Sequence, residues 1–119
     1  MPKRKNWPPE DGDVTYLIER LDALEDRNNV RFEALFGSFF ICAQGHYVRV
    51  CGEAHPRDGL EIGQHLKVAV TLYDPKGRVV NSGSCYLSPP EKFYGFEAFS
   101  LDVNCGLEIV KIRVYPQRA

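Results

Sequence analysis

The stretch LKVAVTLYDPKGRVV, from Leu66 to Val80, predicts a β-hairpin. Over 66–73, Leu and Val alternate with Lys, Ala, Thr and Tyr, which is the two-residue period of a strand with one buried face. The DPKG segment at 74–77 is typical of a tight turn, because Pro fixes φ, Asp caps the turn and Gly accepts a left-handed backbone. The hairpin therefore predicts a structural scaffold of strands, and its residues do not indicate a catalytic site.

Segments on both sides of the hairpin carry similar strand patterns. The predicted strands are 30–42, 46–54, 66–73, 78–87, 93–103 and 107–115. Gly37 marks a bulge or bend in the first of them, and Pro116 is expected to end the last. Turn signals recur about every 8 to 12 residues and no helices alternate with the strands. We therefore expect a mainly all-β fold, an antiparallel immunoglobulin-like β-sandwich of about seven strands in two sheets.

The segment 13–26, DVTYLIERLDALED, carries a helical pattern. Its apolar residues recur at positions 14, 17, 18, 21 and 24, and Asp13 can cap the N-terminus. A strand stays open as the alternative, because Tyr16 and Ile18 also alternate and neighbouring strands can override helix propensity. We expect a short N-terminal helix that packs on its own domain or in the groove of a partner.

Length and charge set the broad class of the protein. The 119 residues are enough for a single core, so residues 14–119 are expected to form one β-sandwich domain behind a flexible N-terminal tail, 1–13. The net charge of −1 argues against a domain that neutralises phosphates, and no nucleic-acid partner is expected. No window reaches the roughly 18 apolar residues of a membrane span and no secretory signal is evident, so we expect a soluble, cytoplasmic protein.

The hairpin resembles the FxLYD type of immunoglobulin-like bacterial domain. The matching residues are Val68, Val70, Leu72, Tyr73, Asp74, Gly77, Val79 and Val80. By strand pattern the likeness extends over residues 45–116, although Val70 stands where the family has its Phe. The resemblance implies an immunoglobulin-like sandwich, and it carries no catalytic residues because such domains share none.

Histidine and cysteine residues between positions 46 and 65 are the candidates for chemistry. The four cysteines form no CxxC pair, so free thiols are expected in the cytoplasm, and disulfides are the alternative for an exported chain. His46, His55 and His65 together with Cys51 leave open a metal- or thiol-dependent enzyme. Sequence spacing alone does not bring these side chains together, so we expect no metal, no cofactor and no catalytic residue.

Aromatic residues crowd the stretch that follows the double-proline loop. Phe93 and Tyr94 are adjacent and point to opposite sides of a strand unless the backbone bulges at Gly95. Internal packing of these rings is the favoured interpretation. The alternative is that one of them is exposed and, with Phe96, forms an interaction patch, and Trp7 is a separate aromatic residue able to dock. A further alternative is that such a patch binds a carbohydrate or small ligand.

These patterns together predict a non-catalytic β-sandwich that serves as an interaction or accessory module. The expected partner is an unidentified protein or a second copy, since an exposed edge strand can pair with its own copy. The competing hypothesis is the metal- or thiol-dependent enzyme that uses the segment 46–65.

Overall fold

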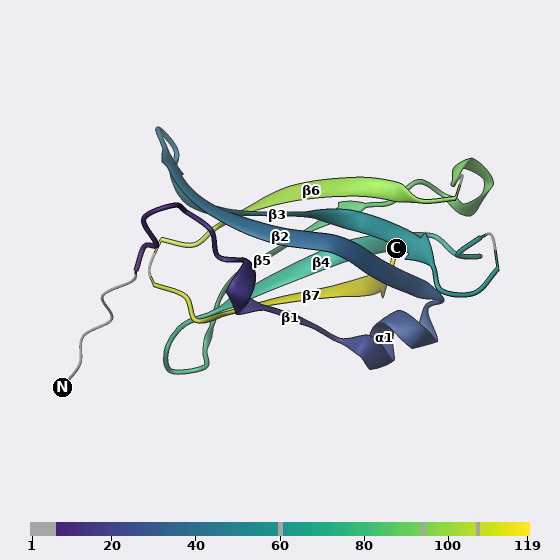
Figure 1. Cartoon of the computed structure of the whole chain (residues 1–119), viewed down its shortest axis with the longest axis horizontal. Coiled ribbons are helices and arrows are strands. Elements are labelled where there is room, and N and C mark those ends of the chain that lie inside the picture. The colour runs from purple at the N-terminus through teal and green to yellow at the C-terminus, as the bar shows by residue number, and fades with distance from the viewer. Residues whose placement is uncertain (1–6, 60, 94, 107) are drawn as a thin grey trace.

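The computed structural model describes residues 7–59, 61–93, 95–106 and 108–119 (Figure 1). Within these ranges a four-stranded sheet has the order β1-β7-β4-β5 and a three-stranded sheet the order β2-β3-β6. The strands are β1 (Ile18–Arg20), β2 (Val30–Cys42), β3 (Gly45–Pro56), β4 (Leu66–Tyr73), β5 (Val79–Tyr86), β6 (Glu97–Asn104) and β7 (Lys111–Arg118). The helices are η1 (Thr15–Leu17), α1 (Asp22–Arg27) and η2 (Pro90–Lys92).

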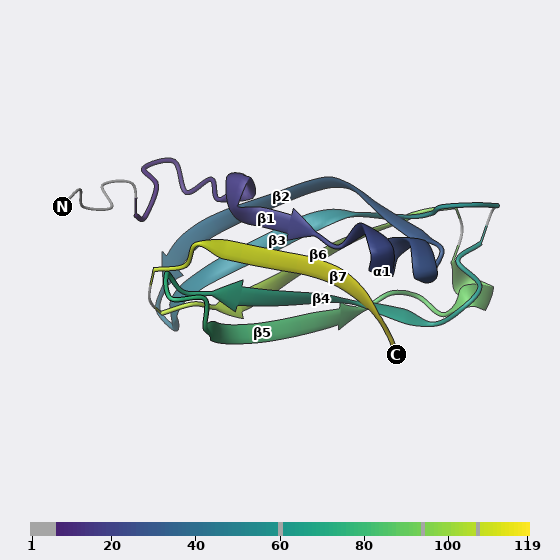
Figure 2. The ribbon, with the colours of Figure 1, turned by 90° about the horizontal axis from the view of Figure 1, so that it is seen from below.

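The two sheets pack face to face as stacked layers around one apolar core (Figure 2). Phe32 and Val50 enter this core from the three-stranded sheet, and Val70, Leu72 and Ile112 from the four-stranded sheet, all without exposed surface. The strand pairs of the described ranges are antiparallel except for β1 with β7. The predicted β-sandwich is therefore confirmed. No helix in the described ranges has both the length and the apolar character needed to cross a membrane.

The predicted hairpin is confirmed and places β4 at the centre of its sheet, between β5 and β7. Its turn is held by Asp74, whose Oδ1 accepts the backbone N–H groups of Lys76 and Arg78, both at 2.9 Å. Gly77 takes the left-handed conformation expected of it, with φ of 79°. Because the Arg78 N–H bonds to the ionised carboxylate, it lowers the pKa of Asp74.

The helix predicted over 13–26 is wrong in its extent, because this segment divides into η1, β1 and α1. The strand alternative holds for Ile18–Arg20, which pair in parallel with residues 112–114 of β7. This pairing gives β7 a neighbour on the edge that faces away from β4, and those backbone bonds outweigh the local helical preference. The short helix that remains is α1.

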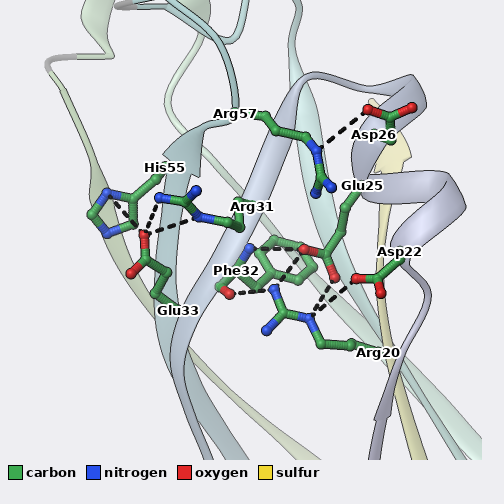
Figure 3. A network of polar contacts seen from close by, with 9 residues as sticks. All are labelled: Arg20, Asp22, Glu25, Asp26, Arg31, Phe32, Glu33, His55 and Arg57. Atoms are coloured by element: carbon green, nitrogen blue, oxygen red, sulfur yellow. Dashed lines mark hydrogen bonds and ion pairs between the residues drawn. The ribbon is translucent and has the colours of Figure 1, made fainter.

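A buried carboxylate joins β1, α1 and β2 (Figure 3). Glu25 has no exposed surface, and its oxygens accept the Nε and Nη2 hydrogens of Arg20 at 3.0 and 2.7 Å. The backbone N–H of Phe32 donates to the same carboxylate at 3.0 Å, while Arg20 also donates to the Phe32 carbonyl. The bond to Glu25 raises the pKa of Arg20. This cluster holds α1 against the start of β2.

The described part of the predicted tail lies along β2 rather than free in solvent. The N–H of Phe39 donates to the Gly12 carbonyl at 2.7 Å, and the Val14 N–H donates to Gly37 at 2.9 Å. Trp7 packs edge-on against Phe39, with ring centroids 5.1 Å apart. Residues 7–13 therefore cover part of the edge of β2, and residues 1–6 lie outside the described residues.

Pro116 does not end the last strand, contrary to the prediction, because β7 continues to Arg118 and pairs Pro116 with Val68 of β4. Strand β1 ends opposite Val114, two residues earlier. The proline nitrogen can face this side of β7, where no neighbouring strand requires an N–H donor. A proline at a locally free edge is therefore compatible with an otherwise continuous strand.

Candidate interaction face

A bulge in β2 decides which of its side chains face solvent. Glu33 lies opposite Glu53 of β3 and Phe36 lies opposite Cys51, so β2 has one extra residue between these paired positions. Ala34, in this interval, has a left-handed backbone with φ of 54°. Before the bulge, Val30 and Phe32 face the core, and after it Leu35, Gly37 and Phe39 do so.

The change in alternation places two phenylalanines on the outer surface of the three-stranded sheet. Phe36 is 48% exposed. Phe40 stacks on Tyr47 of β3, with ring centroids 5.7 Å apart and planes inclined by 17°. The Arg49 guanidinium lies over the Phe40 ring, 4.9 Å from its centroid. Phe36, Phe40, Tyr47, Arg49 and Cys51 are together called the aromatic face.

Strand β6 fixes the polar members of the aromatic face. Arg49 donates to both carboxylate oxygens of Asp102, at 2.8 and 3.1 Å, and this contact raises the pKa of Arg49. Cys51 Sγ lies 3.4 Å from the hydroxyl oxygen of Ser100. The guanidinium is therefore held in one orientation between a carboxylate and an aromatic ring.

A polar cluster continues this outer surface toward the end of β3 (Figure 3). His55 Nε2 lies 2.9 Å from the Glu53 carboxylate, and Nδ1 lies 3.8 Å from that of Glu33. Arg31 donates to Glu33 at 2.8 Å and lowers the pKa of this carboxyl. The half-exposed ring of Phe96 stacks on the imidazole at 5.1 Å with an 8° interplanar angle. These contacts order the edge of the aromatic face.

No family model, curated protein or solved structure matches this chain. The resemblance of the hairpin to FxLYD-type domains therefore stays a prediction.

The structure does not bring together the residues of the metal- or thiol-dependent enzyme hypothesis. Within the described ranges, no group of three or more His, Cys, Asp or Glu side chains is placed to hold a metal ion. His46 packs on Phe39 at 5.8 Å, and His65 Nε2 lies 3.0 Å from the Leu87 carbonyl. Cys51 faces outward from β3, whereas His46, an odd number of residues away, belongs to the opposite side of that strand.

The residues predicted to form an interaction patch are distributed over the molecule. Phe93 is buried in the core, with 6% of its surface exposed. Phe96 lies beside the last residues of β3, whereas Trp7 packs on β2 near the opposite end of the sheet. Tyr94 lies outside the described residues. Phe96 and Trp7 therefore do not share a surface.

The prediction for 30–42 named a strand with a bulge or bend at Gly37, and it did not identify Phe36 and Phe40 as surface residues. The sequence FEALFGSFF nevertheless indicates that a phenylalanine faces outward. Phe39 and Phe40 are adjacent and cannot both face the core of a regular strand. As for the adjacent pair Phe93 and Tyr94, one ring of such a pair is expected on the outer surface unless the backbone bulges.

Proposed function

We propose that the chain is a non-catalytic β-sandwich module that binds a protein partner through the aromatic face. The observation that carries the proposal is the changed alternation of β2, which exposes Phe36 and places Phe40 beside Tyr47 and Arg49. Aromatic residues and arginine supply much of the binding energy at protein interfaces. A sheet surface built from them supports a role in recognition.

The contacts within the aromatic face also favour binding, because they limit side-chain freedom before a partner arrives. Phe40 contacts both Tyr47 and Arg49, and Arg49 is bonded to Asp102. Immobilising a flexible side chain at an interface costs roughly 0.5–1.5 kcal/mol. Side chains that are already ordered avoid part of this loss.

The same proposal assigns the module to the immunoglobulin-like class and to the cytoplasm. The hairpin motif over 66–80 supports the class. All four cysteines are described, and Cys42, Cys51, Cys85 and Cys105 are free thiols. Unpaired cysteines fit a compartment that keeps thiols reduced.

The test compares two double variants of the full chain. The first combines Phe36→Ser with Phe40→Ser, and the control combines Val79→Ser with Tyr86→Ser on β5 of the other sheet. Val79 and Tyr86 are 62% and 66% exposed, so the control removes apolar surface remote from the aromatic face. After cross-linking in an extract of the source cells, we expect mass spectrometry to find a partner with the parent and the control. Its recovery with the first variant should fall at least about ten-fold.

Equal recovery of partners with both variants would contradict the proposal. Light scattering at several concentrations, on the same proteins, tests whether the partner is a second copy. A dimer that is lost only in the Phe36→Ser, Phe40→Ser variant assigns self-association to the aromatic face. A dimer that persists in this variant, without any other partner, places the contact elsewhere and overturns the proposal.

A further inference from the structure

A shallow hollow of about 560 Å³ lies between α1 and the C-terminal strand β7, near the chain end marked C in Figure 1. Lys67 of β4 and Tyr115 of β7 line it from the four-stranded sheet, and Leu24 lines it from α1. The Tyr115 hydroxyl oxygen is 2.9 Å from that of Thr71, which fixes the ring. The hollow lies on the four-stranded sheet, whereas the aromatic face lies on the three-stranded sheet. Its role is therefore independent of the function proposed above.

Three positively charged side chains line this hollow, and no Asp or Glu from the described part of the chain is among its lining residues. Arg27, Lys67 and Arg118 line it, and none of them takes part in an ion pair within the described part of the chain. Asp26, the acidic neighbour of Arg27, pairs instead with Arg57 at 3.3 Å. The whole chain carries a net charge of −1, so this concentration of positive charge is local.

The last turn of α1 borders the hollow, and its Leu24 carbonyl already accepts hydrogen bonds. The Leu24 carbonyl accepts both the backbone N–H of Asn28, at 3.1 Å, and its side-chain Nδ2, at 2.8 Å. Gln64 in turn donates to Asn28 Oδ1 at 3.1 Å. A carbonyl that is already bonded repels an approaching anion less than a free one.

We propose that this hollow binds a small phosphate-type anion. The guanidinium groups of Arg27 and Arg118 can each present two parallel N–H donors to phosphate oxygens, and Lys67 supplies a third point charge. The hollow, of about 560 Å³, has room for such an anion beside these side chains. A phosphate with two or more negative charges matches three cations better than a single carboxylate does.

The test is calorimetric titration of the full chain with pyrophosphate, with acetate as the monovalent comparison. We expect pyrophosphate to bind and acetate not to bind under the same conditions. Arg27→Gln with Arg118→Gln should weaken pyrophosphate binding at least about ten-fold, since each charge-assisted contact is worth close to that factor. Lys76→Gln with Lys92→Gln, two exposed lysines outside the hollow, removes equal charge and should change binding less than about two-fold.

A further variant, Arg118→Lys, keeps the charge but removes the two-donor geometry. We expect it to bind pyrophosphate more weakly than the parent and more tightly than the double arginine variant. Sedimentation with phosphatidylcholine vesicles, with and without phosphatidic acid, distinguishes a lipid phosphate from a free one. The proposed anion site would be contradicted if pyrophosphate did not bind. It would also be contradicted if the Lys76 and Lys92 substitutions weakened pyrophosphate binding as much as the two arginine substitutions.

Discussion

Glu25 shows how one side chain can hold three segments of the chain together. Its carboxylate has no exposed surface and accepts hydrogen bonds from Arg20 and from the backbone of Phe32. Burying a charge costs several kcal/mol, and this cost is offset only when the charge is paired and hydrogen-bonded. The two-donor contact with Arg20 and the Phe32 N–H together meet this requirement, so β1, α1 and β2 are held at a common point.

Glu25→Gln is expected to lower the free energy of unfolding by about 2–3 kcal/mol. This is less than the roughly 3–5 kcal/mol for a fully buried pair, because the Arg20 side chain is 40% exposed and water screens the interaction. Urea unfolding measures the change. Asp22→Asn is the control, since Asp22 lies 3.8 Å from Arg20 and is 77% exposed. An equal loss from both substitutions would contradict a special role for the buried carboxylate.

The bulge in β2 depends on a matching glycine in β3. A Cβ atom at Gly52 would lie 2.7 Å from Leu35 Cδ2 and 3.0 Å from Phe99 Cζ, closer than side-chain contacts allow. The absence of a side chain at Gly52 therefore lets Leu35 pack inward next to the bulge. With Leu35 inward, the next residue, Phe36, faces solvent. The aromatic face is thus a consequence of how two neighbouring strands pair.

Deletion of Ala34 should preserve the aromatic face. It removes the extra residue while Glu33 and Phe36 keep Glu53 and Cys51 as their partners. We expect urea unfolding to show a loss of less than about 1 kcal/mol.

Deletion of Ser38, in the regular part of the β2–β3 ladder, is the control for this prediction. This deletion moves the neighbouring side chains to the opposite face of the sheet. It should lower the free energy of unfolding by more than about 2 kcal/mol. If the Ala34 deletion proved as damaging as the Ser38 deletion, the bulge would be required for folding itself.

Hydrogen-bonded carboxylates are distributed over the whole sandwich and link its stability to pH. Four of them have a pKa below the ordinary value, each mainly because of one hydrogen bond. The carboxyls and their main partners are Asp13 with the Thr15 side chain, Glu19 with Arg113, Glu33 with Arg31, and Asp74 with the Arg78 backbone. They lie on one strand of each sheet, in the hairpin turn between β4 and β5, and on the segment that precedes β1.

Unfolding in urea should become easier as the solution is acidified. Because folding lowers these pKa values, the carboxyls stabilise the fold above their ordinary values of 3.8 for Asp and 4.5 for Glu. This contribution is lost as the pH falls through the folded values. We expect a nearly constant urea midpoint above pH of about 5 and a decline below about 4.5. Glu19→Gln should make the decline shallower, whereas a midpoint insensitive to acid would refute this account.

The local sequence was sufficient to predict the backbone wherever neighbouring residues alone fix its conformation. The hairpin at 66–80 was predictable because its alternation and its Asp-Pro-Lys-Gly turn impose the conformation without help from distant strands. The two-sheet sandwich followed from the repetition of such patterns along the chain. The division of 13–26 was less predictable, because β1 depends on pairing with residues 112–114 of β7.

The aromatic face and the basic hollow depend on contacts between residues far apart in the chain. The outward turn of Phe36 requires a residue in β2 to be skipped opposite β3, and the hollow requires α1 to bring Arg27 near Arg118. Alternation along one strand identifies two faces, but it cannot show where a bulge exchanges them. The amino-acid pattern thus determines that this chain forms a β-sandwich, while strand register and helix placement decide which side chains meet on its surface.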